Sequence, residues 1–316
     1  WFGFFDKALE RADKAIEYSK LAGHPEYAYN AYVIKSYSCV WISDYQKLHA
    51  LKEEITQLLD ENFNLETYVH AFIVHSIFFG DMGRFDKAVE EGLKALHMAE
   101  KYSDDSLISI SSTFIAIAYN LKGDTGRAEK YAALAIEKAP NPRDDLAARI
   151  CHAWLLCRSG NSHQGIQILA PCVSILESCK VKQAPVNLHW LLGEGYWLAK
   201  EYDKAIQTVE SLMELAERHN MKHRLGIAHY IKGEIALETD PSSAPTHLEK
   251  SIDIFQSIKA EYYLARAYSA YGRYYKQNGN AAQTREYLTK ALEIFERLEI
   301  IDQPAKVKKE LAELPA

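Results

Sequence analysis

The sequence predicts an all-α fold, a right-handed solenoid of antiparallel helix pairs. The main observation is a turn and helix start that recurs about every 40 residues. Its clearest copy combines Gly83, Phe85 and Asp86 with a small residue, Ala88, and a second small residue seven positions later, Ala95. Apolar residues elsewhere recur at spacings of three and four, without the alternation of strands. A fixed period of this length is typical of repeat arrays. The equivalents of Ala88, here called anchors, stand at positions 8, 48, 88, 128, 165, 205, 244 and 284.

The expected elements follow from these anchors and from the turn residues between them. A single array covers residues 1–316: the second helix of an incomplete unit over 1–23, seven helix pairs over about 25–298, and a polar capping helix over 302–314. Pro25 and Pro142 suit the first turn of a helix. The incomplete first unit predicts that the chain is part of a longer protein. The paired helices are expected over 25–43 and 45–62, 65–82 and 85–102, 106–122 and 125–138, 143–159 and 162–180, 185–199 and 202–219, 222–237 and 243–258, and 261–277 and 281–298.

Several copies resemble the tetratricopeptide repeat. One copy carries Leu192, Gly193 and Tyr196 on its first helix, then Tyr202 at the turn and Ala205 on its second helix. Small residues let the two helices approach, and the aromatic side chain fills the space beside them. The period exceeds the family's usual value of about 34 residues and is similar to that of long bacterial regulatory arrays. The resemblance implies a superhelix whose first helices line a concave groove.

The tail carries a second resemblance. Residues 291–298 and 304–311 resemble the C-terminal end of bacterial adenylate and guanylate cyclases that carry a P-loop ATPase followed by a tetratricopeptide array. This implies a cytoplasmic signalling protein, with the chain's own upstream catalytic domains as one candidate partner.

Composition and motifs exclude several classes of function. The 37 basic and 43 acidic residues give a net charge of −6, which argues against nucleic acid as a partner. No apolar run approaches the roughly 18 residues of a membrane span. The sequence contains no phosphate-binding glycine loop, HExxH or GxSxG motif, so we expect neither an enzyme nor a cofactor or metal.

Two sets of polar residues have an ordinary structural interpretation. The five cysteines form no CxxC pair, and we expect them to be reduced and packed in a cytosolic protein. His223 lies four residues after His219 at a helix–helix turn, and we expect it to be exposed to solvent rather than to bind a metal. The cysteines are Cys39, Cys151, Cys157, Cys172 and Cys179.

The family's registration predicts which side chains face the groove. Its middle would be aromatic and its C-terminal end basic, an arrangement typical of binding surfaces, and arginines there could bind a carboxylate or phosphate. Two alternatives stay open. A shift of one residue would place the tryptophans in the core, and the basic residues could simply pair with neighbouring acids. The predicted groove residues are Tyr37, Trp41, Asn120, Trp154, Asn187, Trp190, Glu194, Trp197, Tyr230, Arg266, Arg273 and Lys276.

Two functions compete at this stage. The first is a non-catalytic interaction and regulatory module of a larger bacterial signalling protein, which binds a protein partner or its own catalytic domains through the groove. The second is a sensor that holds a short peptide or small molecule in the aromatic groove, as array-type peptide-pheromone receptors and sugar-sensing activators do. Side chains such as Asn120 and Asn187 could then hydrogen-bond a peptide backbone.

Overall fold

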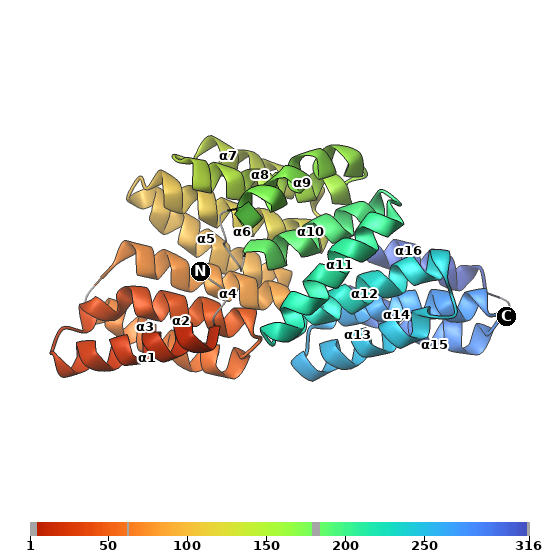
Figure 1. The fold of residues 1–316 in the computed structure, drawn as a ribbon, viewed down its shortest axis with the longest axis horizontal. Coiled ribbons are helices and arrows are strands. Elements are labelled where there is room, and N and C mark those ends of the chain that lie inside the picture. The colour runs from red at the N-terminus through yellow and green to blue at the C-terminus, as the bar shows by residue number, and fades with distance from the viewer. Residues whose placement is uncertain (1–4, 62, 179–183, 315–316) are drawn as a thin grey trace.

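The structure, a computed structural model, describes residues 5–61, 63–178 and 184–314. Within these residues it contains sixteen α-helices and one 3₁₀ turn and no strand, so the predicted all-α solenoid is confirmed (Figure 1). The elements are α1 (Phe5–Leu21), η1 (Pro25–Ala28), α2 (Tyr29–Trp41), α3 (Tyr45–Glu61), α4 (Leu65–Asp81), α5 (Phe85–Lys101), α6 (Asp105–Lys122), α7 (Thr125–Glu137), α8 (Pro142–Arg158), α9 (Ser162–Ser178), α10 (Ala184–Leu198), α11 (Tyr202–Arg218), α12 (Lys222–Thr239), α13 (Ala244–Ile258), α14 (Glu261–Gln277), α15 (Ala281–Arg297) and α16 (Gln303–Ala312).

Consecutive helices pack as antiparallel pairs, and successive first helices also contact one another. The helix α6, for example, contacts its partner α7 and the neighbouring first helices α4 and α8. The first helices therefore form one continuous layer, here called the inner layer. Several helix starts are fixed by Asn or Asp side chains that accept a hydrogen bond from a backbone N–H of the first turn, as at Asn64, Asp104 and Asn141.

The anchors fill the contact within each pair. Ala88, Ala128, Ala205 and Ala244 have no exposed surface. The recurring part of the sequence is therefore packing chemistry, as small residues at helix crossings usually are.

The first complete pair departs from the expected helix over 25–43. The chain there makes the 3₁₀ turn η1 before α2 begins at Tyr29. Pro25 has no N–H, and His24 supplies no capping side chain; the first hydrogen bond runs instead from the N–H of Tyr27 to the carbonyl of His24, at 3.1 Å. A missing cap and an i→i+3 bond tighten the first turn.

The one glycine among the anchors, Gly165, has a steric reason. A Cβ atom at this position would collide with the carbonyl oxygen of Ala153 and the Sγ of Cys157, because α8 and α9 cross unusually closely there. We therefore expect Gly165→Ala to lower the free energy of unfolding by about 1–3 kcal/mol through overpacking. Gly126→Ala is the matched control, since a Cβ there meets open space within a helix and should be neutral or slightly stabilising. Equal urea midpoints for the two variants would contradict the close crossing.

The superhelix closes on itself, so that its N-terminal half (α1–α8) contacts its C-terminal half (α11–α16) (Figure 1). The N–H of Ile301 donates to the carbonyl of Lys122 at 2.9 Å. Gly83 lies against Tyr262, where an added Cβ would stand 2.9 Å from the backbone nitrogen. Arg158 donates from Nη2 to the Tyr262 hydroxyl at 3.1 Å. Turns of the early units therefore pack on the helix starts of the late units.

A glycine pair tests this closure. Gly83 and Gly279 both have positive φ, +80° and +71°, but a Cβ at Gly279 meets nothing. Alanine at either position costs about 1 kcal/mol for the left-handed backbone. We expect Gly83→Ala to cost roughly 1–3 kcal/mol more than Gly279→Ala, because only the former presses the two halves apart. Chemical denaturation and the radius of gyration measure the difference, and matching values for both variants would mean that the halves do not touch at Gly83.

Candidate functional site

The candidate site lies where inner-layer helices of the N-terminal half meet inner-layer helices of the C-terminal half. It consists of charged and aromatic side chains that contact one another, from α4, α8, α10, α12 and α14. We call this set the inner network. Its members are Asp81, Trp154, Arg158, Trp190, Glu194, His223, Arg224, Tyr262, Tyr263 and Arg266.

Glu194 is the centre of the inner network. Its side chain is 1% exposed. One carboxylate oxygen accepts from Arg158 Nη1 at 2.9 Å and from Nη1 and Nη2 of Arg266 at 3.2 Å. The other accepts from Trp154 Nε1 at 2.9 Å. Burial alone would raise the pKa of Glu194, but the attraction of Arg158 and Arg266 and these hydrogen bonds outweigh it, so its pKa is lowered and the group is ionised.

The guanidinium groups also lie over aromatic rings. Arg266 is 4.7 Å from the ring centroid of Tyr230, and Arg224 is 4.5 Å from that of Trp190. Arg158 lies 5.2 Å from the centroid of Trp154. Ring faces carry negative charge, so they stabilise cations that have left water.

A second charged group joins α4 to α12. Arg224 lies 3.6 Å from a carboxylate oxygen of Asp81. Arg224 also donates to Nδ1 of His223. Because a guanidinium only donates, Nδ1 must accept, and the imidazole carries its proton on Nε2. This agrees with the pKa of His223, which burial lowers to about 4, so that the ring is neutral at pH 7.

The inner network holds more positive than negative charge. Three guanidinium groups (Arg158, Arg224 and Arg266) face two carboxylates (Glu194 and Asp81), and each of the five side chains is at most 11% exposed. In the described part of the chain, Nε of Arg158 and Nε1 of Trp190 are buried without a hydrogen-bond acceptor. Buried cations without a full set of partners are costly, which sets this region apart from an ordinary core.

The predicted groove residues come together, but the middle ones are not exposed. Trp154 has no exposed surface and Trp190 is only 7% exposed, so neither lines an open groove, and both have the core placement that the sequence left open as an alternative. Closure of the superhelix covers them, with Tyr263 lying against Trp190. Glu194 and Tyr230 are buried in the same way.

The remaining predicted residues lie in several environments. Tyr37 is buried, with its hydroxyl 3.0 Å from Nδ1 of His70, and Asn120 is also buried. Trp41 and Trp197 are half-buried. The side chain of Asn187 lies outside the described residues.

The basic end of the groove is paired with acids, which was the alternative left open by the sequence. Arg273 contacts Glu234, which also accepts from the Tyr230 hydroxyl at 2.6 Å. Lys276 pairs with Glu313 of the capping region at 2.6 Å. Arg266 binds Glu194 instead, so the three basic residues do not form one anion site.

Several network residues were not predicted. His223 is 2% exposed, so the expectation that it is solvated is wrong. Asp81, Tyr262 and Tyr263 were not singled out because they stand at helix ends, where polar residues and turns usually meet water. A difference between repeats could have indicated the two tyrosines as network residues: α14 carries two adjacent tyrosines at its start, whereas the equivalent helix α6 begins with Asp105 and a serine.

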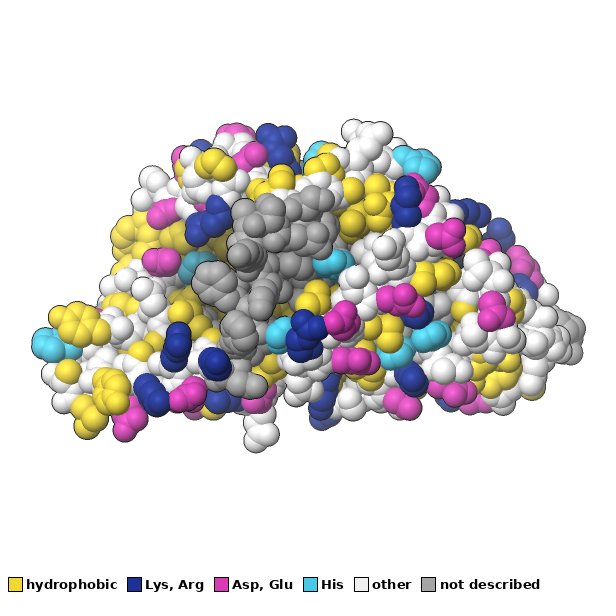
Figure 2. All heavy atoms as spheres, viewed as in Figure 1, with side chains coloured by type: hydrophobic (Ala, Val, Ile, Leu, Met, Phe, Trp, Pro, Cys, Tyr) yellow, Lys and Arg dark blue, Asp and Glu magenta, His cyan; other side chains and the backbone are white. Residues whose placement is uncertain are grey.

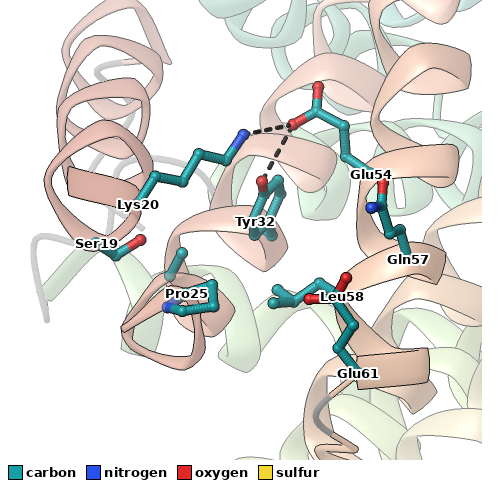
Figure 3. A pocket seen from close by; sticks show the side chains of 9 residues that line it. Ser19, Lys20, Pro25, Tyr32, Glu54, Gln57, Leu58 and Glu61 are labelled. Carbon is teal, nitrogen blue, oxygen red and sulfur yellow. Dashed lines mark hydrogen bonds and ion pairs between the residues drawn. The ribbon is translucent and has the colours of Figure 1, made fainter. Parts of the chain in front are cut away.

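A cavity of about 280 Å³ lies apart from the inner network, between α1, η1 and α3 (Figure 3). The side chains of Lys20 and Tyr32 both point to Glu54 there; the Tyr32 hydroxyl donates to it at 3.1 Å and the Lys20 ammonium lies 3.6 Å away. The 3₁₀ turn η1 supplies Pro25 and Ala28 to the wall of this cavity. The lining residues are Ser19, Lys20, Pro25, Ala28, Tyr32, Glu54, Gln57, Leu58 and Glu61.

The described residues on the face seen in Figure 2 show no dominant charge, because acidic, basic and hydrophobic side chains are interspersed there. Among the described residues, no helix is long and apolar enough to cross a membrane, and no group of three or more potential ligands could hold a metal ion. Cys39, Cys151, Cys157 and Cys172 are buried free thiols, and Cys179 lies outside the described residues.

Sequence comparison finds one match to a protein family. Residues 265–297, which cover most of α14 and all of α15, match the model of the tetratricopeptide repeat. No curated protein matches the sequence.

Solved structures extend the similarity to the whole array. NprR in complex with its cognate peptide NprX matches with a TM-score of 0.64 and 13% identity, over 98% of this chain and 96% of that chain. A Rap protein complexed with Competence and Sporulation Factor matches with a TM-score of 0.61 and 12% identity, over 98% and 96%. A signal transduction ATPase with a tetratricopeptide repeat sensor, PH0952 from Pyrococcus horikoshii, matches with a TM-score of 0.55 and 15% identity, over 97% of this chain but only 53% of that one. At these identities the similarity establishes the fold.

Proposed function

We propose that this chain is a non-catalytic regulatory module that binds a peptide, or a peptide segment of a partner protein, on its inner layer. The observation that carries the proposal is the inner network. Arginine, tryptophan and tyrosine dominate the energetics of binding surfaces, and here side chains of all three types contact one another on the inner-layer helices α8, α10, α12 and α14. A buried charged network contributes little net stability compared with apolar packing, so its presence favours a role in binding.

The similar folds support the peptide as ligand. NprR was solved with its cognate peptide, on an array that this chain matches along nearly its whole length. The proposal transfers only the class of ligand, since the identity of 13% carries no residue-level information.

A larger signalling protein is the context that we propose for the module. PH0952 is described as a signal transduction ATPase with a repeat sensor, and this chain corresponds to about half of it. The catalytic domains of the protein that contains this module would then be an alternative occupant of the module's inner layer. Association with nucleotide cyclase domains, expected from the tail of the sequence, stays a prediction.

Binding to the inner layer requires the halves to separate, because the network is covered in the closed form. We therefore expect a bound peptide to change tryptophan fluorescence, since Trp154 and Trp190 stand in the network, and to raise the melting temperature by mass action. The test titrates a pool of random heptapeptides and monitors both signals. Arg266→Gln should abolish the response, whereas Lys290→Gln, which removes the 2.6 Å pair with Glu286 away from the network, should retain it. A response that survives Arg266→Gln would place binding elsewhere.

A further inference from the structure

The carboxylate of Glu194 is bound by groups from two other helices. Trp154 and Arg158 belong to α8, in the N-terminal half, and Arg266 belongs to α14, in the C-terminal half. Glu194 itself comes from α10, between the halves. The donors thus form a receptor for a carboxylate, and α10 supplies the carboxylate that occupies it.

This receptor holds together without Glu194. Arg158 also donates from Nη2 to the Tyr262 hydroxyl at 3.1 Å, which joins α8 to α14 directly. Arg266 rests on Tyr230 at 4.7 Å and on Tyr263 at 5.5 Å from their centroids. The two guanidinium groups are therefore positioned by neighbours other than the carboxylate that they bind.

The receptor also has unused capacity for an anion. The inner network contains one more guanidinium than carboxylate, and His223 is neutral. Nε of Arg158 is buried and has no acceptor in the described residues. Guanidinium groups bind carboxylates in a planar, two-pronged geometry that uses several N–H donors at once.

We propose that Glu194 is an internal substitute for a carboxylate of the ligand, so that the module selects peptides with an acidic side chain or a free C-terminal carboxylate. This inference rests on the proposed function and names its ligand class. An incoming carboxylate exchanges with that of Glu194 on Arg158 and Arg266. This exchange breaks the hydrogen bonds that join Glu194 of α10 to Arg158 of α8 and Arg266 of α14. Ligand binding and the separation of the two halves are therefore coupled.

Small molecules test the receptor first. Glu194→Ala leaves the two guanidinium groups without their carboxylate, and propionate resembles the part that was removed. We expect propionate to raise the melting temperature of Glu194→Ala, with no shift from propionamide at the same concentration and none in the wild type. Phosphate distinguishes a general anion site from a carboxylate site. Equal shifts with propionamide, or a larger shift with phosphate than with propionate, would overturn the assignment.

Matched peptide pools then test the ligand class. Two pools of random heptapeptides differ only in that one carries Asp, Glu and a free C-terminus where the other carries Asn, Gln and an amide. We expect only the acidic pool to bind the wild type, and to bind Glu194→Gln at least tenfold more tightly, because the internal competitor is then neutral. Glu194→Gln also serves if Glu194→Ala does not fold. Equal binding of both pools to both proteins would overturn the carboxylate assignment and leave the proposed function standing, whereas the failure of both pools would overturn the proposed function itself.

Discussion

Replacing Glu194 by alanine is expected to lower the free energy of unfolding by about 3–5 kcal/mol. The reason is that Arg158 and Arg266 would stay buried without the carboxylate that neutralises them, and the loss of one partner of a buried ion pair is strongly destabilising. Trp154 Nε1 would lose its acceptor as well. Urea denaturation at pH 7, extrapolated to zero urea, measures the loss.

An exposed glutamate is the control for this variant. Glu286 forms a 2.6 Å pair with Lys290, and both side chains are more than 40% exposed. Pairs between exposed side chains contribute little to stability because water and salt screen their charges, so the stability of Glu286→Ala should be close to that of the wild type. If Glu194→Ala were equally mild, water would have to reach the arginines, and the closed form of the structure would be wrong.

Stability is expected to fall steeply as the pH drops from about 6.5 towards 4. Burial lowers the pKa of His223 to about 4, and burial with the charges of His247, Lys250 and Lys232 lowers the pKa of His229 to about 4. The folded pKa lies below the unfolded value of 6.5, so the unfolded chain binds protons first, and stability present above pH 6.5 is lost as the pH falls towards 4. Each histidine accounts for about 3 kcal/mol over the full interval.

The experiment separates these histidines from the carboxylates. Glu194 has a pKa lowered from 4.5, so its contribution is lost only below about pH 4.5. Urea midpoints between pH 7 and 4.5 therefore report mainly on histidine. The double variant with His223→Gln and His229→Gln should show a much flatter profile in this window. A wild-type slope in that variant would assign the acid sensitivity to other groups.

The helices and their pairing could be predicted because the information is local. Each anchor acts on the helix next to it, and Ala88 and Ala128 are as buried as their period implies. The repeats also predict which positions of the first helices face the inner layer. Trp154, Glu194 and Arg266 were assigned to it from three different units, and Glu194 accepts hydrogen bonds from both other residues.

Exposure of those residues could not be predicted, because it depends on the accumulated curvature of many units. A small rotation at each crossing decides whether the superhelix stays open or its early units contact its late units. No single unit encodes that sum. Contacts such as Phe85 with Tyr262, whose ring centroids are 5.1 Å apart, arise only once the two halves have come together. Neither residue departs from the repeat pattern in a way that identifies its partner. The burial of His223 could not be predicted for the same reason, since it also depends on the contact between the two halves.

The hydrogen bond from Ile301 to Lys122 also bears on how the chain folds. In an open array each repeat interacts only with its neighbours, so unfolding can begin at either end and advance unit by unit. The closed superhelix adds contacts of very long sequence separation, which slow folding and make distant units cooperative. Loss of α16, which begins just after Ile301, would therefore destabilise the turn between α6 and α7. The molecule is expected to unfold in one thermal transition rather than by fraying from its ends.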